Sequence, residues 1–416
     1  MKGGLSFLWE RFELFFRTVR VSGWKTALGK TGSFLLYFLP TGKYPGIRRS
    51  PYYDRSWYLK TYLRKDLPWI DPLRHYVEAG WQFGHSPSEH FPGALYLFYH
   101  PELLRSGKCP LEDLEEKKLT PKDLTRMCRR FDGQLEALHR KIGWRRGVPG
   151  PPAVRQDFFP KVGIHLHCFY ADMLPEIAKN LAYLPCGYDL YVSVPENGGV
   201  EVGEIEKFAA GLKNLRKCEI RQVPNRGRDV APLIRTFGKQ LADYDCVCHV
   251  HTKRSPHFKQ NWSEFLLKHL FGDEEWLQRI FTMLANGTSI IYPRDFLNFI
   301  RDPSGWGENL AAAQSFLDRR GVAIDLKEEF PLIEFPQGCM FWARARDISD
   351  FLTLDLDYRD FPEEPIGTDG SLAHVLEHLL FVLVYRKCSG IFQLYRPEEA
   401  GLLGEKRYVY RELDPD

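Results

Sequence analysis

The chain has 416 residues, enough for two or three domains. Hydrophobic residues make up 44% of it, and no apolar run reaches the ~20 residues of a membrane-spanning helix, so the composition predicts folded domains and excludes general disorder. The net charge of +3 is too close to neutral for a dedicated nucleic-acid-binding protein, and no nucleic-acid partner is expected.

Basic charge is concentrated in residues 1–49, where nine Lys and Arg face two Glu, a local charge of +7. Apolar and aromatic residues between Leu5 and Val19 recur at helical spacing, which is typical of an amphipathic helix on an anionic lipid surface. A helix packed on its own domain is the alternative. Charges interrupt the apolar run and no small-residue cleavage site follows, so a signal peptide is not expected.

The nine cysteines are scattered and include no Cys-x-x-Cys pair. This spacing indicates neither a zinc motif nor a disulfide framework. We therefore expect free thiols and a reducing, cytoplasmic compartment.

Residues 50–118 contain an imperfect internal repeat. Trp57-Tyr58-Leu59 recurs as Leu95-Tyr96-Leu97, and Asp71-Pro72-Leu73 recurs at the same offset as Cys109-Pro110-Leu111. Repetition of this kind indicates stacked supersecondary units, here a mostly helical accessory module. Its histidines stand alone beside aromatic residues and are interpreted as structural.

Residues 119–153 are predicted to connect two domains. Apolar positions after Thr120-Pro121 trace one helical face and end near Gly143. The stretch 147–152 is rich in proline and glycine and is interpreted as a linker.

Residues 154–395 alternate between strand and helix patterns, followed by a tail over 396–416. We expect strands over 161–169, 188–194, 218–223 and 245–251, and helices over 174–184, 203–216 and 230–242. This alternation predicts an α/β sandwich with a largely parallel sheet, whose ligands gather at the carboxyl ends of the strands.

Candidate ligand-binding residues follow three of these strands. The first strand ends in His165, His167 and Tyr170. The third runs into a glycine turn that opens a helix, where backbone amides and arginines bind anions. Asp229 in this turn is either a helix N-cap or a group that orients a hydroxyl or an arginine. The turn residues are Asn225, Arg226, Gly227, Arg228 and Asp229.

The fourth strand ends in His249 and His251, with Lys253 and Arg254 directly after it. Side chains at i and i+2 of a strand point the same way, so the two imidazoles can share a ligand. The two cations suit a diphosphate. A metal site is the alternative, although Mg²⁺ prefers oxygen ligands, which this pair does not supply.

Several motifs together resemble the rhamnan synthesis protein F family over residues 160–390. They are an Asn-x-Gly-x-Asp turn within Val223–Pro232, a His-Thr-Lys strand end within Tyr244–Ser255, Trp262, and the segments Gly163–Tyr170, Gly338–Arg344 and Asp369–Glu377. The resemblance implies a glycosyltransferase that builds rhamnose-containing or related bacterial surface polysaccharides from a nucleotide-diphosphate sugar, with dTDP as the expected nucleotide.

The order of elements also resembles a GT-A glycosyltransferase, a Rossmann-type sandwich. In that fold the fourth strand normally ends in Asp-x-Asp, which here reads His249-Val250-His251. This departure disfavours a divalent-metal cofactor such as Mg²⁺ or Mn²⁺. Asp355-Leu356-Asp357 lies too far downstream and is interpreted as a polar loop.

Inverting enzymes of this kind place an acidic residue before an acceptor-side helix, where it takes the proton of the attacking hydroxyl. Asp369 precedes a predicted helix over 371–386 and is the first candidate, with an N-cap as the alternative role. Glu377, two turns along that helix, is the second.

The sequence thus predicts a hexosyltransferase on the inner face of the bacterial cytoplasmic membrane. Its expected partners are a nucleotide-sugar donor, a lipid-linked or polymeric glycan acceptor and an anionic membrane surface. A non-catalytic carbohydrate-binding scaffold and a phosphosugar transferase remain alternatives.

Overall fold

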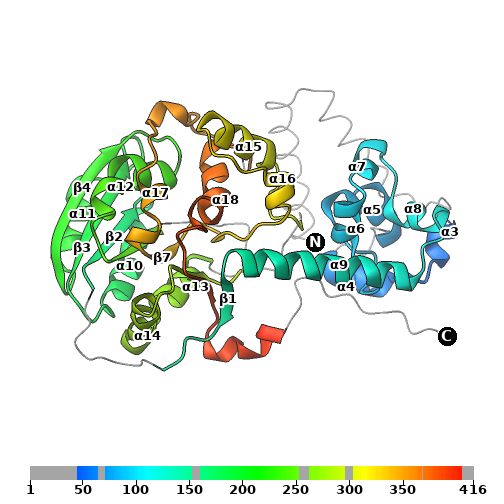
Figure 1. The fold of residues 1–416 in the computed structure, drawn as a ribbon, viewed down its shortest axis with the longest axis horizontal. Helices are drawn as coiled ribbons and strands as arrows, with labels where there is room; N and C mark the ends of the chain where they lie inside the picture. Colours follow the sequence, from blue (N-terminus) through cyan, green and yellow to red (C-terminus); the bar gives the residue numbers. More distant parts are fainter. Residues whose placement is uncertain are drawn as a thin grey trace, which may run out of the picture. The chain divides into compact units, whose positions relative to one another are not determined.

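Figure 1 shows a computed structural model of the chain, which describes residues 45–63, 71–151, 160–252, 262–295, 303–367 and 369–404. Two compact units are present. The helical unit comprises residues 1–132, 300–303 and 406–416, and the sheet unit comprises residues 133–299 and 304–405. Most of the proposed membrane-surface segment, residues 1–44, lies outside the described residues.

The helical unit carries the predicted repeat as two sets of short helices. The step along the chain from the start of α4 to the start of α6 equals the step from the start of α5 to the start of α8. Both α5 and α8 start with a proline at their first turn, where a missing amide proton costs nothing. The helices of this unit are α3 (Pro45–Arg49), α4 (Arg55–Tyr62), α5 (Pro72–Glu78), η1 (Gly80–Phe83), α6 (Gly93–Tyr99), α7 (Glu102–Ser106) and α8 (Pro110–Glu116).

Aromatic side chains fill the core of the helical unit. Tyr58, Tyr76, Tyr96 and Trp81 are fully buried. The Tyr58 hydroxyl bonds to Nδ1 of His75 at 2.8 Å and to Nδ1 of His85 at 2.9 Å. These histidines therefore take part in the packing of the module.

Helix α9 (Pro121–Lys141) is the long helix predicted to connect the modules. It is followed by an eight-stranded sheet of order β1-β8-β6-β7-β5-β2-β3-β4, and among these described strands β7 alone is antiparallel to its neighbours. The predicted, largely parallel α/β fold is confirmed. The strands are β1 (Trp144–Gly147), β2 (Val162–His167), β3 (Tyr188–Pro195), β4 (Leu215–Val223), β5 (Cys246–His251), β6 (Ile290–Pro293), β7 (Phe341–Arg344) and β8 (Ile391–Leu394).

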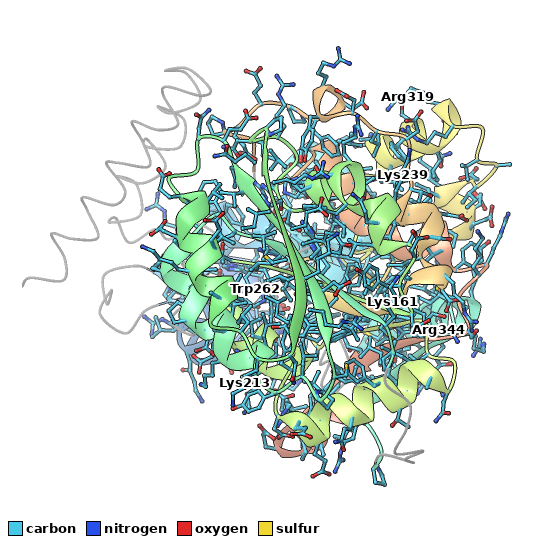
Figure 2. The ribbon with its side chains drawn as sticks, turned by 90° about the vertical axis from the view of Figure 1, so that its left-hand side faces the viewer. Lys161, Lys213, Lys239, Trp262, Arg319 and Arg344 are labelled. Atoms are coloured by element: carbon cyan, nitrogen blue, oxygen red, sulfur yellow. The ribbon has the colours of Figure 1, made fainter. Side chains whose placement is uncertain are left out.

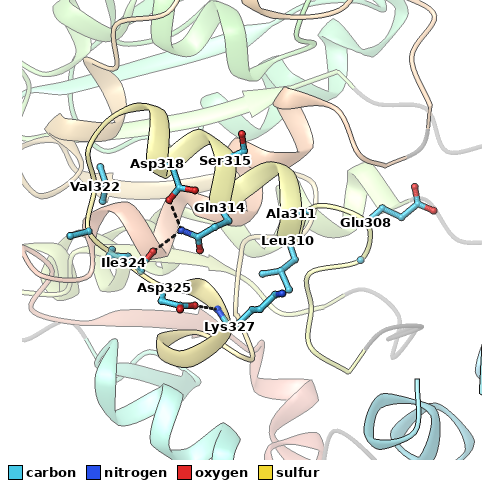
Figure 3. A pocket seen from close by; sticks show the side chains of 12 residues that line it. Glu308, Leu310, Ala311, Gln314, Ser315, Asp318, Val322, Ile324, Asp325 and Lys327 are labelled. Atoms are coloured by element: carbon cyan, nitrogen blue, oxygen red, sulfur yellow. Dashed lines mark hydrogen bonds between the residues drawn. The ribbon is translucent and has the colours of Figure 1, made fainter. Parts of the chain in front are cut away.

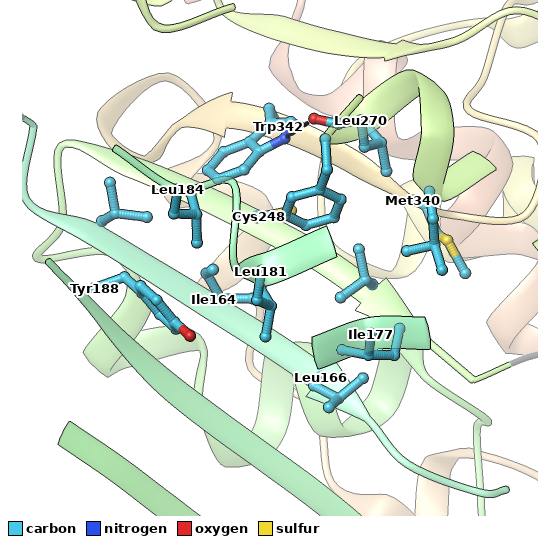
Figure 4. Close-up of a cluster of buried hydrophobic side chains, with 14 of the residues drawn as sticks. Ile164, Leu166, Ile177, Leu181, Leu184, Tyr188, Cys248, Leu270, Met340 and Trp342 are labelled. Carbon is cyan, nitrogen blue, oxygen red and sulfur yellow. Dashed lines mark hydrogen bonds between the residues drawn. The ribbon is translucent and has the colours of Figure 1, made fainter. Parts of the chain in front are cut away.

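One face of the sheet packs against α10 (Leu174–Leu181), α11 (Val202–Ala210), α13 (Trp262–Leu270) and α14 (Glu274–Ala285). Figure 4 shows this core, which includes Ile164 and Leu166 of β2 together with Leu181 and Cys248, and in which the Trp342 indole donates to the Leu270 carbonyl at 2.9 Å. Each buried large apolar side chain contributes about 1.5–3 kcal/mol. Successive strand residues alternate between faces, so His165, His167, His249 and His251 point to the opposite face.

That opposite face carries most of the remaining elements. They are η3 (Pro232–Thr236), α12 (Gly238–Leu241), α15 (Leu310–Arg319), α16 (Leu326–Glu329), η4 (Ala345–Asp347), α17 (Ser349–Leu352), η5 (Tyr358–Asp360) and α18 (Leu372–Val384). Contacts of α18 with α15 and α17, and of η3 with β2, tie this layer together. Two further short helices contact helices of the first face: η2 (Ala171–Met173) contacts α10, and Glu398 of η6 (Pro397–Gly404) pairs with Lys268 of α13.

Two predicted helices differ from the structure. The helix expected over 203–216 ends at Ala210, because Asn214 takes a left-handed backbone with φ 58° and β4 begins at Leu215. The helix expected over 230–242 is split into η3 and α12. A Cβ on Gly238 would collide with the Leu352 carbonyl, so this close backbone approach requires glycine.

The outside of the sheet unit is highly charged. Lys161, Lys213, Lys239 and Arg319 are exposed at its surface (Figure 2). Within the part of the chain that the structure describes, no helix has the length and apolar character needed to cross a membrane.

Candidate functional site

The carboxyl ends of four neighbouring parallel strands form one edge of the sheet, hereafter the carboxyl edge. β2, β3, β4 and β5 end there at His167, Pro195, Val223 and His251. β7 runs in the opposite direction, so the turn before it, Gly338 and Cys339, reaches the same edge. The topology therefore brings the predicted strand-end residues together with a turn that lies far downstream in the chain.

Behind the carboxyl edge lies a buried chain of hydrogen bonds, hereafter the histidine chain. His167 Nδ1 and His165 Nε2 each lie 2.9 Å from the Ser193 hydroxyl. His165 Nδ1 lies 3.0 Å from His249 Nδ1, and His249 Nε2 lies 3.1 Å from the Asp229 carboxylate. The members come from β2, β3, β5 and the turn after β4, so the chain joins neighbouring strands through their side chains.

Burial and neighbouring groups shift the pKa values of three members of the histidine chain, His165, His167 and Asp229. Burial lowers the pKa of His167 to about 3, and burial with the nearby His249 lowers the pKa of His165 well below its ordinary value. Burial alone raises the pKa of Asp229, but His251 and the hydrogen bond from His249 outweigh it and hold that pKa well below the usual range. Asp229 is therefore a carboxylate beside uncharged His165 and His167.

An ionised carboxylate only accepts, so His249 Nε2 donates to Asp229. In the arrangement in which His249 Nδ1 accepts from His165 Nδ1, His165 Nε2 accepts from Ser193 and Ser193 accepts from His167 Nδ1. In this arrangement every donor in the histidine chain points toward Asp229.

Asp229 does not cap a helix. Its side chain is directed to His249, and the residue at the N-cap of η3 is Ala231. This contact is with a histidine, whereas the predicted orienting role was toward a hydroxyl or an arginine, so that role stays a prediction.

Gly227 shapes the turn that carries Asp229. Its φ is 69°, and a Cβ would lie 2.5 Å from the Ala231 Cβ and 2.6 Å from the Phe361 ring. Arg226 donates to the Phe361 carbonyl at 3.2 Å and pairs with Glu363. The turn is therefore tied to the 361–363 segment, and Asn225 is half-buried within it.

Arg228 reaches helix α18. Its guanidinium donates to His374 Nε2 at 2.9 Å and to the Gly367 carbonyl at 3.1 Å, while Glu364 lies 3.7 Å away. A guanidinium only donates, so Nε2 is the unprotonated nitrogen, and Nδ1 lies 2.9 Å from the Ser371 hydroxyl. Burial and the Arg228 cation lower the pKa of His374 to about 4. Arg228 is itself exposed and takes a left-handed backbone with φ 51°.

Asp369 lies in the turn before α18 and accepts hydrogen bonds from the loop that contains Glu308 and Asn309. Its Oδ2 accepts from the Glu308 amide at 3.0 Å, and its Oδ1 accepts from the Asn309 side chain and the Gly370 amide. Burial raises its pKa, but these donors outweigh burial and the pKa is lowered, so the carboxylate is ionised. The N-cap of α18 is Ser371, so the alternative N-cap role of Asp369 is wrong.

Three further predicted residues have structural contacts. Glu377 accepts from the Gly338 amide at 2.9 Å and so ties α18 to the turn before β7. The Tyr170 amide donates to the Thr252 hydroxyl at 2.9 Å, which joins the ends of β2 and β5. His251 Nε2 lies 2.8 Å from the Gly338 carbonyl, and its ring centroid lies 6.2 Å from that of His249.

Lys253 and Arg254 lie outside the described residues. Asp355-Leu356-Asp357 forms a loop, as predicted: Leu356 is buried, and Asp357 accepts from the Arg359 amide at the start of η5.

A pocket of about 920 Å³ lies between α15 and the segment 322–327 (Figure 3). Its apolar wall includes Leu310 and Ile324, and Gln314, Asp318 and Lys327 add polar groups. Gly307 and Glu308 form its border, and the Glu308 amide donates to Asp369. The pocket therefore adjoins the loop that Asp369 holds.

Sequence reasoning did not identify Ser193, Cys339 or His374 as site residues. Ser193 follows from strand alternation, since it is paired with His167 in the register between β2 and β3. Cys339 lies in the segment Gly338–Arg344 that supports the family resemblance, but its place at the carboxyl edge depends on the antiparallel course of β7. His374 shares a helix face with Glu377, which was the available indication.

Comparison with known proteins gives one family. The family model described as rhamnan synthesis protein F matches residues 153–388, more than half of the chain. Protein WxcX of two strains of Xanthomonas campestris pv. campestris, described as uncharacterised, is 26% identical over 239 residues, which cover 56% of this chain. The matched region spans 33% of the length of these relatives.

Proposed function

The chain belongs to the rhamnan synthesis protein F family, and from this premise we propose that its sheet unit is a glycosyltransferase of bacterial surface-polysaccharide synthesis. The proposed reaction moves L-rhamnose or a related sugar from a nucleotide-diphosphate donor, such as a dTDP-sugar, to a growing glycan with inversion. The observation that carries the proposal is the approach of the Arg228 cation and the Asp369 carboxylate to the same turn before α18.

The sheet order is compatible with a GT-A-like arrangement. Parallel β4, β3, β2 and β5 are followed by antiparallel β7 and then β6. In such open α/β sheets ligands bind outside the carboxyl ends of the strands. We therefore propose that the donor binds at the carboxyl edge, beside the Asn-Arg-Gly-Arg-Asp turn.

Cations are proposed to stabilise the diphosphate leaving group. Arg228 is the main described candidate, since its guanidinium is exposed while His374 and Gly367 hold its orientation. Arg226, Lys253 and Arg254 are proposed to add positive charge. Negative charge grows on the leaving diphosphate as the glycosidic bond breaks, so positioned cations lower the barrier.

His165 and His249 are fully buried, and both ring nitrogens of each are bonded within the histidine chain. For these two we therefore propose a positioning role in place of direct donor contact. Tyr170, His167 and His251 remain proposed neighbours of the nucleotide or sugar.

The strand end expected to carry Asp-x-Asp supplies imidazoles that are bonded to Asp229 and to the Gly338 carbonyl. This donor set does not fit an oxygen-ligated Mg²⁺ or Mn²⁺ ion. We derive no step through such an ion and expect transfer without added Mg²⁺ or Mn²⁺.

Asp369 is proposed as the general base, which takes the proton of the acceptor hydroxyl as that oxygen attacks the anomeric carbon. The pocket beside Glu308 is proposed to hold part of the glycan acceptor, because its lining combines apolar and polar groups. Glu377 is the second candidate base.

The protein is proposed to act on the cytoplasmic face of the membrane, where lipid-linked glycan acceptors are assembled. The +7 charge of residues 1–49 supports attraction to anionic lipid.

A panel of nucleotide-sugars tests the proposal. The full chain is incubated with each donor, with and without a glycan acceptor, and the released nucleoside diphosphate is measured. Release that depends on one donor supports sugar transfer. If the protein is a carbohydrate-binding scaffold, no nucleotide-sugar donor binds. If it is a phosphosugar transferase, the released product is a nucleoside monophosphate.

A further inference from the structure

Three side chains with different ligand atoms converge behind the carboxyl edge. A carboxylate oxygen of Asp229, a ring nitrogen of His249 and the sulfur of Cys339 all lie within 4.8 Å of one another. They come from the turn after β4, from β5 and from the turn before β7. We propose that Asp229, His249 and Cys339 form a binding site for one divalent ion of the zinc class, a site separate from the proposed glycosyl transfer.

The ligand atoms decide which ions suit this site. A thiolate and an imidazole select zinc or similar transition metals, whereas Mg²⁺ and Ca²⁺ prefer sets made of oxygen. The thiolate and the carboxylate together balance the charge of a divalent ion. Three protein ligands leave a tetrahedral ion one further position.

The burial of the three ligands favours a site over a chance cluster on the surface. His249 is fully buried, Cys339 is 2% exposed and the Asp229 side chain is 13% exposed. Both turns that deliver ligands hold non-glycine residues in the left-handed region: Arg228 at φ 51° and Cys339 at φ 54°. Such conformations cost free energy and persist where the surrounding structure requires them.

Two of the three ligands, His249 and Cys339, are supported by further contacts. Metal-binding histidines use their second nitrogen for a hydrogen bond that orients the ring, and His249 Nδ1 already lies 3.0 Å from His165 Nδ1. Glu377 and His251 both bond to Gly338, next to Cys339. The positions of these two ligands are thus supported from β2, β5 and α18.

Binding of the ion changes the protons in a defined way. The ion replaces the thiol proton of Cys339, which is released, and it takes the place of the proton at His249 Nε2. The His249 ring then carries its proton on Nδ1, which donates to His165 Nδ1. His165 Nε2 then donates to Ser193, and Ser193 donates to His167. Starting from the arrangement in which every donor points toward Asp229, all three rings change tautomer and one proton leaves per ion.

Cobalt is the probe for this site. The full chain is reduced, stripped with a chelator and titrated with Co²⁺. We expect a thiolate-to-cobalt charge-transfer band, displacement of that band by Zn²⁺, and release of one proton per ion. Cys339→Ser is expected to abolish the band. Cys248→Ser is the matched control, since Cys248 is buried on the other face of β5 and should leave the band unchanged.

A second variant tests the supporting contact. His165→Gln keeps all three ligands but removes the imidazole behind His249, and the Co²⁺ dissociation constant is expected to rise about 10- to 100-fold. Nitrogen NMR of the unsubstituted chain should show the three histidines exchanging tautomers on addition of Zn²⁺. These two readouts do not depend on whether Cys339→Ser folds.

A missing charge-transfer band in the unsubstituted chain, or an equal band in Cys339→Ser, would overturn the proposed site. Nucleotide release from donors is measured separately, so failure of the metal site leaves the proposed transfer reaction unaffected.

Discussion

His165 and His249 lie on adjacent strands with nearly parallel rings, whose centroids are 4.9 Å apart and whose Nδ1 atoms are 3.0 Å apart. Both side chains are fully buried. Two neighbouring imidazoles tolerate this arrangement when one donates and the other accepts, so the pair depends on correct tautomers. Ser193 and Asp229 at the two ends of the pair supply that constraint.

Ser193→Ala is expected to destabilise the sheet unit. The change removes the hydroxyl shared by His165 and His167, and each buried nitrogen left without a partner costs roughly 1–3 kcal/mol. Urea denaturation measures the difference in the free energy of unfolding. Ser315→Ala on exposed α15 is the control and should change that value by less than about 0.5 kcal/mol. Equal stability of the two variants would contradict the histidine chain.

Stability is expected to fall in mild acid. His167, with its pKa lowered to about 3, and His165, with its pKa also lowered, bind protons more readily in the unfolded chain, where histidine titrates near 6.5. The free energy of unfolding is therefore at its full value above pH ~6.5. Below that pH it declines by up to about 1.4 kcal/mol per pH unit for each histidine. Urea denaturation at pH 7.5, 6 and 5 measures the slope. His167→Gln should reduce it, and an unchanged slope would contradict the role of His167.

Arg228→Ala is expected to slow sugar transfer by about 10²–10³-fold if the guanidinium stabilises the leaving diphosphate. Kinetics with the active donor measure the loss, and Arg319→Ala on exposed α15 serves as the control. The same change should raise the pKa of His374 from about 4, because the Arg228 cation holds it down. NMR titration measures that pKa. A raised pKa with normal transfer would show that Arg228 orients α18 but does not meet the donor.

The Asp369→Asn variant distinguishes a role of Asp369 as the general base from a role in holding the loop at Glu308 and Asn309. Loss of a general base lowers kcat by roughly 10²–10⁴-fold. The carboxylate also accepts three hydrogen bonds, so some loss of stability is expected with either role. Transfer rate and Tm are measured together, with Asn309→Ala as the control that disturbs the same tie without removing the carboxylate. If the two variants lose equal activity, Asp369 acts through the loop. An inactive, folded Glu377→Gln beside an active Asp369→Asn would assign the base to Glu377.

Removal of residues 1–49 is expected to release the protein from anionic vesicles. Its +7 charge attracts acidic headgroups, and salt should weaken the binding of the full chain. Sedimentation with acidic and neutral vesicles measures the effect. Equal sedimentation of the full and shortened chains would contradict this partner.

The sequence pattern was sufficient to predict β2, β3 and β5, because each is a short, largely apolar run that is buried on both faces of the sheet. β1 was not predicted: Trp144–Gly147 contains two arginines, and only its pairing with β8 makes it a strand. The same limit applies at the site. His165, His249 and Asp229 were identified from their strand ends, whereas Cys339 depends on the direction of β7, which local pattern does not contain.

One edge of the sheet is formed by β1 paired with β8, which are the first and last of its described strands in the chain. During synthesis, β1 leaves the ribosome long before its partner, so this part of the sheet forms only when Ile391–Leu394 is complete. A fragment cut to the family match, residues 153–388, lacks both strands and leaves β6 as a bare edge. Such an edge favours aggregation. Recombinant fragments of this chain should therefore extend from α9 through residue 395 at least.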